Sequence, residues 1–234
     1  MNIANYVESL YRQHTEELVN CAAFQALVDG RATRADYDAF IRGVYRTHQN
    51  SPQFLAFIYA LCPPKAQERV AHNLLEEMGL EEEEGESHPE LLLALISGAG
   101  LQAEIESLKV SAQETLRESV CQPLLFGSLR EVGLSVMTEV FSFEHMLAHT
   151  SSQIADFLAT HRDLSEATLI WFRHHSEVDI EHAEEALLTI QDYVDYYEFD
   201  EAEARDVIDL AMRENVYIKR YLSTEALADA RDMR

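Results

Sequence analysis

The stretch Ser165–Tyr197 reads SEATLIWFRHHSEVDIEHAEEALLTIQDYVDYY and contains neither glycine nor proline. This pattern predicts one long helix. Within it, His175, Asp179 and His182 stand at positions i, i+4 and i+7, which fall at roughly 0°, 40° and −20° around a helix axis. Two imidazoles and a carboxylate therefore project from one narrow stripe. Nitrogen and oxygen donors aimed at one point suit a first-row transition metal.

The rest of the chain also favours helices. Its 234 residues include 8 glycines and 5 prolines, too few for many turns or short strands, and apolar residues recur at helical spacing. No linker rich in Gly, Pro or Ser divides it. We predict one all-α domain over residues 1–234, a bundle of about seven or eight helices, with the tail 223–234 as a candidate for disorder. The expected helices cover about residues 6–28, 33–62 with a break near Asn50–Pro52, 64–78, two short pieces around Gly98 and Gly100, 123–160, 165–197 and 200–222.

Composition limits the partners and the location of the protein. The net charge of −24 should repel phosphate backbones and anionic membrane surfaces, so we expect no nucleic acid and no membrane as partners. No signal peptide or membrane-spanning segment is evident. Cys21, Cys62 and Cys121 are scattered and odd in number, which indicates reduced thiols and a cytoplasmic protein.

Three further residues could complete a metal site. Glu77 stands at the end of one expected helix, and His88 opens the next one after an acidic loop, so the two could meet at one ion. Glu144 lies in VFSFEHML, residues 140–147, where a carboxylate amid apolar neighbours needs a partner or a cation. By contrast, His14 is interpreted as a core histidine. Second-sphere or surface roles are expected for His145, His149 and His174.

The charges of the six residues fit a dinuclear centre. Three imidazoles and three carboxylates facing two Fe(II) ions would leave a net charge near +1, which makes burial electrostatically reasonable. Mixed nitrogen and oxygen donors on facing helices are the pattern of di-iron carboxylate bundles.

The order NLLEEMG (73–79), HPELL (88–92), FSFEH (141–145) and H-x-x-x-D-x-x-H (175–182) resembles the haem-oxygenase-like di-iron oxidases, whose fold is also that of the TenA and PqqC relatives. The resemblance implies a haem-oxygenase-like bundle that binds two Fe(II) ions, or Mn, and uses O₂ as co-substrate. It implies six metal ligands: Glu77, His88, Glu144, His175, Asp179 and His182. The loop after Glu77 is longer than the family pattern, so Glu76 or Glu81 is kept as an alternative. Tyr45 matches an aromatic position near the family's metal site and is the expected catalytic side chain.

The function implied by this resemblance is O₂-dependent oxidation of a small organic acid or amine, by oxidative C–C or C–N cleavage or by N-oxygenation. The substrate should have an apolar or aromatic part, and a homodimer is compatible with the sequence. One alternative is a metal-free, TenA-like (thiaminase II-type) hydrolase or binding protein on the same fold, which would need a positioned cysteine. The other is a non-catalytic interaction protein that uses its acidic surface.

Overall fold

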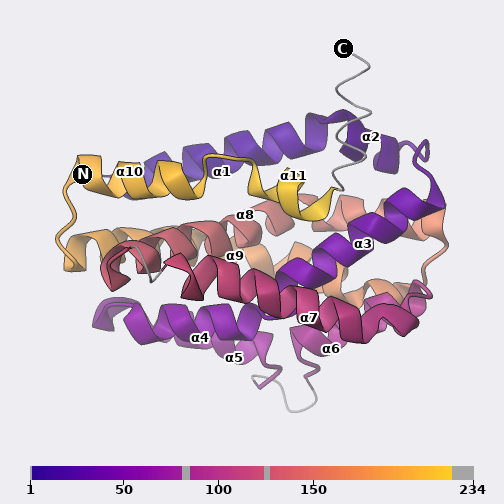
Figure 1. Cartoon of the computed structure of the whole chain (residues 1–234), viewed down its shortest axis with the longest axis horizontal. Coiled ribbons are helices and arrows are strands. Elements are labelled where there is room, and N and C mark those ends of the chain that lie inside the picture. The colour runs from indigo at the N-terminus through magenta and orange to yellow at the C-terminus, as the bar shows by residue number, and fades with distance from the viewer. Residues whose placement is uncertain (1, 81–84, 124–126, 223–234) are drawn as a thin grey trace.

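The computed structural model describes residues 2–80, 85–123 and 127–222, and for residues 177–181 it describes the backbone alone. Every regular element among these residues is a helix, which confirms the all-α class. Two long helices, α8 (Leu129–Arg162) and α9 (Glu166–Tyr196), run along the long axis of the molecule (Figure 1). They form the most extensive contact between any two described helices. This pair is the centre of the bundle.

Shorter helices cover the central pair on both sides (Figure 1). One side carries α1 (Ile3–Asn20), α10 (Glu201–Ala211) and α11 (Val216–Tyr221). The opposite side carries α4 (Ser51–Leu61), α5 (Gln67–Glu77) and α6 (His88–Gly98). The remaining α-helices are α2 (Ala22–Val28), α3 (Arg34–His48) and α7 (Ile105–Leu116), of which α3 packs against α6, α7 and α11. None of the described helices has the length and apolar character needed to cross a membrane.

The turn between α5 and α6 brings two predicted ligands together. Gly79 follows α5 with φ +67°, and a Cβ there would lie 2.7 Å from the backbone nitrogen of Ser87, so the returning chain passes where only glycine fits. Glu90 then accepts hydrogen bonds from the backbone nitrogen (3.1 Å) and the hydroxyl (2.8 Å) of Ser87. This capping box starts α6 at His88, directly beside the end of α5.

Three predicted helix boundaries were wrong. The first helix is interrupted at Cys21, whose extended backbone (ψ 147°) starts α2. The helix expected from residue 123 begins at Leu129, because Ser128 and Glu131 form a capping box there. The last helix is divided at Asn215, which caps α11 by accepting a hydrogen bond from the Ile218 backbone (3.1 Å). These interruptions give more helices than the seven or eight expected; the tail 223–234 lies outside the described residues.

Candidate metal centre

One cluster of donors joins the end of α5, the start of α6 and the N-terminal half of α9. Glu77 Oε1 lies 2.9 Å from His88 Nδ1, and the rings of His88 and His175 are 4.7 Å apart. A ligand atom from each of the three lies within 4.8 Å of the others. Their exposed fractions are only 5%, 4% and 2%. We call Glu77, His88 and His175 the inner cluster.

In the inner cluster, the contact between Glu77 and His88 stabilises the charged form of each. Burial alone would raise the pKa of Glu77, but His88 and the Ser51 hydroxyl outweigh burial, and the pKa lies below its usual range. Burial opposes the charge on His88, yet Glu77 raises the pKa of that imidazole. In this cluster the Glu77 carboxylate favours a proton on His88.

The tautomer of His175 favours metal binding. Its Nδ1 lies 2.7 Å from the Trp171 carbonyl oxygen, so Nδ1–H donates to that oxygen and Nε2 keeps its lone pair. Metal-binding histidines are commonly oriented in this way by a carbonyl on the far ring nitrogen. Burial also holds the pKa of His175 well below its usual range, so the ring stays neutral.

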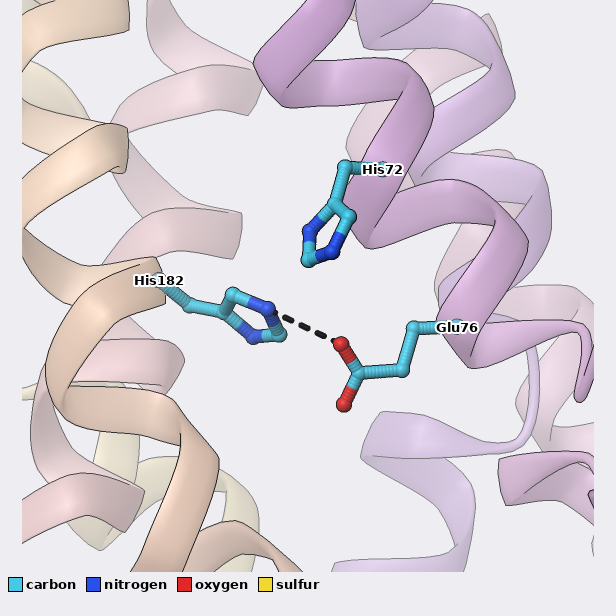
Figure 2. Close-up of side chains that lie close together, drawn as sticks. All are labelled: His72, Glu76 and His182. Atoms are coloured by element: carbon cyan, nitrogen blue, oxygen red, sulfur yellow. Dashed lines mark ion pairs between the residues drawn. The ribbon is translucent and has the colours of Figure 1, made fainter. Parts of the chain in front are cut away.

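A second cluster also lies at the end of α5, where Figure 2 shows His72 and Glu76 of α5 facing His182 of α9. Glu76 Oε2 is 3.0 Å from His182 Nε2, and His72 contributes a third donor within 4.8 Å. The other oxygen of Glu76 lies 2.9 Å from His174 Nε2. Burial would lower the pKa of His182, but its contact with Glu76 and the charge of Glu144 raise it to about 9. We call His72, Glu76 and His182 the outer cluster.

Glu144 of α8 lies between the two clusters. Its Oε2 is 3.9 Å from His182 Nδ1, while Asn73 Nδ2 donates to Oε1 at 3.4 Å. Burial raises its pKa, against the opposing charge of His182, and Glu77 also lies close enough to raise it. A buried carboxylate held between two donor groups suits a bridging position.

The donor set fits one or more divalent first-row cations. The described residues place three carboxylates and several imidazoles within a few ångströms, and the carboxylates raise the pKa of His88 and His182, which favours protons on these imidazoles. Bound cations could replace those protons, because ligand imidazoles must be neutral. The mixed nitrogen and oxygen donors are those used for iron or manganese.

The structure brings together five of the six predicted ligands: Glu77, His88, Glu144, His175 and His182. The side chain of Asp179 lies outside the described residues, as does Glu81. Glu76 was kept only as a substitute for Glu77, yet both carboxylates face donor clusters. His72 was missed, although its i, i+4 spacing from Glu76 places the two on one helix face. The contact of His174 with Glu76 fits the expected supporting role.

Tyr45 is fully buried on α3, and its hydroxyl has no hydrogen-bond partner among the described residues. Burial, with a smaller effect of Glu106, raises its pKa to about 12. One turn later, His48 contacts the ring of Trp171 (centroids 5.0 Å apart) and its Nε2 lies 2.5 Å from the Tyr221 hydroxyl. Thr47 and His48, rather than Tyr45, are the α3 residues that line the cavity beside the inner cluster. The catalytic role of Tyr45 stays a prediction.

A cavity opens beside the inner cluster. Its empty volume, counted with its opening to solvent, is about 600 Å³. Glu77, Glu144 and His175 are among its polar lining residues. Its apolar walls consist of Phe54, Leu55, Val136, Val140, Phe143 and Leu147. The donor clusters and an apolar cavity therefore form one site.

Comparison with known proteins identifies the family of this chain. Residues 38–214 match the model of a family of iron-containing redox enzymes. The chain belongs to that family. The match covers α4 to α10 and most of α3, including every donor of both clusters.

A solved structure has a similar fold. That structure is a domain of unknown function with a haem-oxygenase-like fold from Shewanella denitrificans OS217, and it matches this chain with a TM-score of 0.59 and 17% sequence identity. The alignment covers 100% of this chain and 93% of that one. This likeness confirms the haem-oxygenase-like architecture. A comparison with curated proteins gave no match.

Proposed function

We propose that this chain is a non-haem di-iron enzyme that uses O₂ to oxidise a small organic molecule with an apolar or aromatic part. The supporting observation is that the consecutive carboxylates Glu76 and Glu77 lie in different histidine clusters. The clusters adjoin, since Glu76 also lies within 4.8 Å of His88, and Glu144 lies near both. One cluster alone would suit a mononuclear site. Two clusters sharing a buried carboxylate favour two ions.

The inner cluster and Glu144 would hold one ion, and the outer cluster with Glu144 the other. Iron, when bound there, supplies the redox chemistry that activates O₂. The choice of iron over manganese rests on membership of the iron-containing family.

The protein's own groups position the ligands and the substrate. Ser51 fixes the orientation of Glu77, and Asn73 that of Glu144. His48 is kept neutral beside the inner cluster, because burial lowers its pKa to about 3. The apolar walls limit water and favour an alkyl or aromatic substrate group.

The cysteines give little support to a metal-free hydrolase. Burial raises the pKa of both Cys21 and Cys62, which disfavours a thiolate nucleophile, and Cys121 is exposed. None of the three lines the cavity among the described residues. All three are unpaired, in keeping with a cytoplasmic location, which we also propose.

The test is O₂ reactivity of the protein after anaerobic loading with Fe(II). Exposure to air should produce an iron-dependent absorbance change and consume O₂ faster than the same concentration of free Fe(II). His182→Ala should lower the rate of O₂ consumption to that of free Fe(II). His161→Ala, a change at an exposed histidine, should keep the rate of the parent. If the loaded protein consumes O₂ no faster than free Fe(II), the proposed function is wrong.

A further inference from the structure

A second charged group lines the cavity beside the inner cluster. Arg220 of α11 and Glu139 of α8 form an ion pair there, with Arg220 Nη2 donating to Glu139 Oε1 at 2.5 Å and to the Ser119 hydroxyl at 3.2 Å. Thr47 and Thr115 line the same cavity. Arg220 and Glu139 also line a hollow on the outer surface, so the pair stands between the cavity and solvent.

The position of Arg220 is fixed by the packing of α11. A Cβ at Gly43 would lie 2.6 Å from the Arg220 backbone oxygen, so α11 lies directly on α3. The Tyr217 hydroxyl donates to the Ser142 carbonyl oxygen at 2.8 Å, and Tyr221 contacts His48. A guanidinium held by such a short, anchored helix is preorganised for binding.

The paired charges discriminate between ligand classes. Arg220 and Glu139 together are neutral, with guanidinium N–H groups and a carboxylate oxygen beyond those used in their mutual contact. A fatty acid would place its carboxylate beside Glu139, and a simple amine would place its ammonium beside Arg220. A ligand that has a carboxylate and an ammonium group on one carbon can pair its carboxylate with Arg220 and its ammonium group with Glu139.

Arg46 adds positive charge from outside the cavity. Burial, and then the neighbouring Arg220, lowers the pKa of Arg46, so the two guanidinium groups are close. Arg42, another neighbour, is already paired with Glu104 at 2.7 Å. The carboxylate of a ligand should therefore contribute more to binding than its ammonium group.

We propose that the cavity binds an α-amino acid with an apolar or aromatic side chain, its carboxylate on Arg220, its ammonium on Glu139 and its side chain along the apolar walls. That this amino acid is oxidised rests on the proposed function. Its binding does not, since neither Arg220 nor Glu139 belongs to the donor clusters.

Binding is measured by calorimetry on the metal-free full chain. The probes are L-leucine with 4-methylpentanoate and 3-methylbutylamine, and L-phenylalanine with 3-phenylpropanoate and 2-phenylethylamine. In at least one series the affinity for the amino acid should be about ten-fold or more higher than for either analogue. A loss of affinity of this size is expected when a charged hydrogen-bonding group is removed. The amine should be the weakest of the three. If no probe binds, or if the acid binds as tightly as the amino acid, the proposal is overturned.

Variants assign the two contacts. Arg220→Gln should weaken binding of the amino acid about ten-fold or more. The variant should then bind the amino acid no more tightly than the amine. Glu139→Gln should remove its advantage over the acid, and Arg220→Lys should retain part of the affinity. Arg213→Gln, which changes a residue of the outer hollow alone, is the matched control. Circular dichroism confirms folding of each variant. Unchanged preferences in folded Arg220→Gln and Glu139→Gln overturn the proposal.

Iron content separates this proposal from the proposed function. Arg220→Gln should load as much Fe(II) as the parent. A chain that binds iron and reacts with O₂ but shows no Arg220-dependent preference overturns the ligand assignment alone. A chain that shows the preference but binds no iron overturns the oxidase and leaves the ligand assignment intact.

Discussion

Glu76 and Glu77 are consecutive residues at the end of α5, but their carboxylates contact different histidines. Glu76 Oε2 lies 3.0 Å from His182 Nε2, and Glu77 Oε1 lies 2.9 Å from His88 Nδ1. Neighbouring positions on a helix differ by about 100°, so one helix end can serve two sites. Glu144 links them, because it lies near both His182 and Glu77.

Removing either carboxylate should therefore affect one ion more than the other. We expect Glu76→Ala and Glu77→Ala each to retain close to one iron per chain after anaerobic loading, measured by a colorimetric iron assay. Glu68→Ala, an exposed acid on the same helix, should load like the parent. Equal iron content in all three variants and the parent would contradict the division into two clusters.

Iron binding should become tighter as pH rises toward 9. His182 has a pKa of about 9 in the metal-free chain, so it is protonated at pH 7 and must lose its proton to bind a metal. Each proton displaced changes the apparent affinity about ten-fold per pH unit below that pKa. Calorimetry of Fe(II) binding in buffers of different ionisation enthalpy measures the proton release. Binding without proton release between pH 6 and 8 would be inconsistent with this charge balance.

His145 should make the metal-free protein sensitive to acid. Burial lowers its pKa to about 4, and its Nδ1 has no hydrogen-bond partner among the described residues. Between pH 6.5 and 4 the unfolded chain binds a proton that the folded chain does not, so stability falls as pH falls. At pH 5 this costs about 2 kcal/mol. The free energy of unfolding in urea, measured at pH 7.5 and at pH 5, should fall less for His145→Gln than for the parent. For His161→Gln it should fall as much as for the parent.

Gly43→Ala should loosen α11. The added Cβ would lie 2.6 Å from one α11 backbone atom and 2.9 Å from another, neither of which can turn aside as a side chain can. Overpacking of this kind costs about 1–3 kcal/mol. The free energy of unfolding in urea measures it. At Gly127 the nearest atom to a Cβ is a valine methyl group at 3.3 Å, so Gly127→Ala should be nearly neutral. Equal stability of Gly43→Ala and Gly127→Ala would mean that α11 is not fixed at Gly43.

Helices and their caps could be predicted from sequence where local chemistry decides them. Thr33 caps α3 and Gly79 ends the turn after α5, as their residue types indicate. The break at Cys21 could not be predicted, because apolar spacing continues through it. At Asn215 the local cap on α11 is accompanied by a tertiary contact, the hydrogen bond from its amide to the His14 carbonyl oxygen (2.8 Å).

The candidate site was predicted in part. His175 and His182 were found from their spacing, and Glu144 from its apolar neighbours. The sequence could not decide between Glu76 and Glu77, since adjacent acids at a helix end look equivalent until partners surround them. Arg220 and Glu139 were not predicted, because 81 residues separate them and only the packing of α11 on the bundle brings them together.

The most direct test of the dinuclear account is the iron content of the chain after anaerobic loading with Fe(II) and removal of unbound metal. The account predicts close to two irons per chain for the parent and for the exposed-site control His161→Ala, and clearly fewer for Glu144→Ala and His182→Ala. A parent chain that retains no iron, or Glu144→Ala and His182→Ala variants that retain as much as the parent, would contradict it.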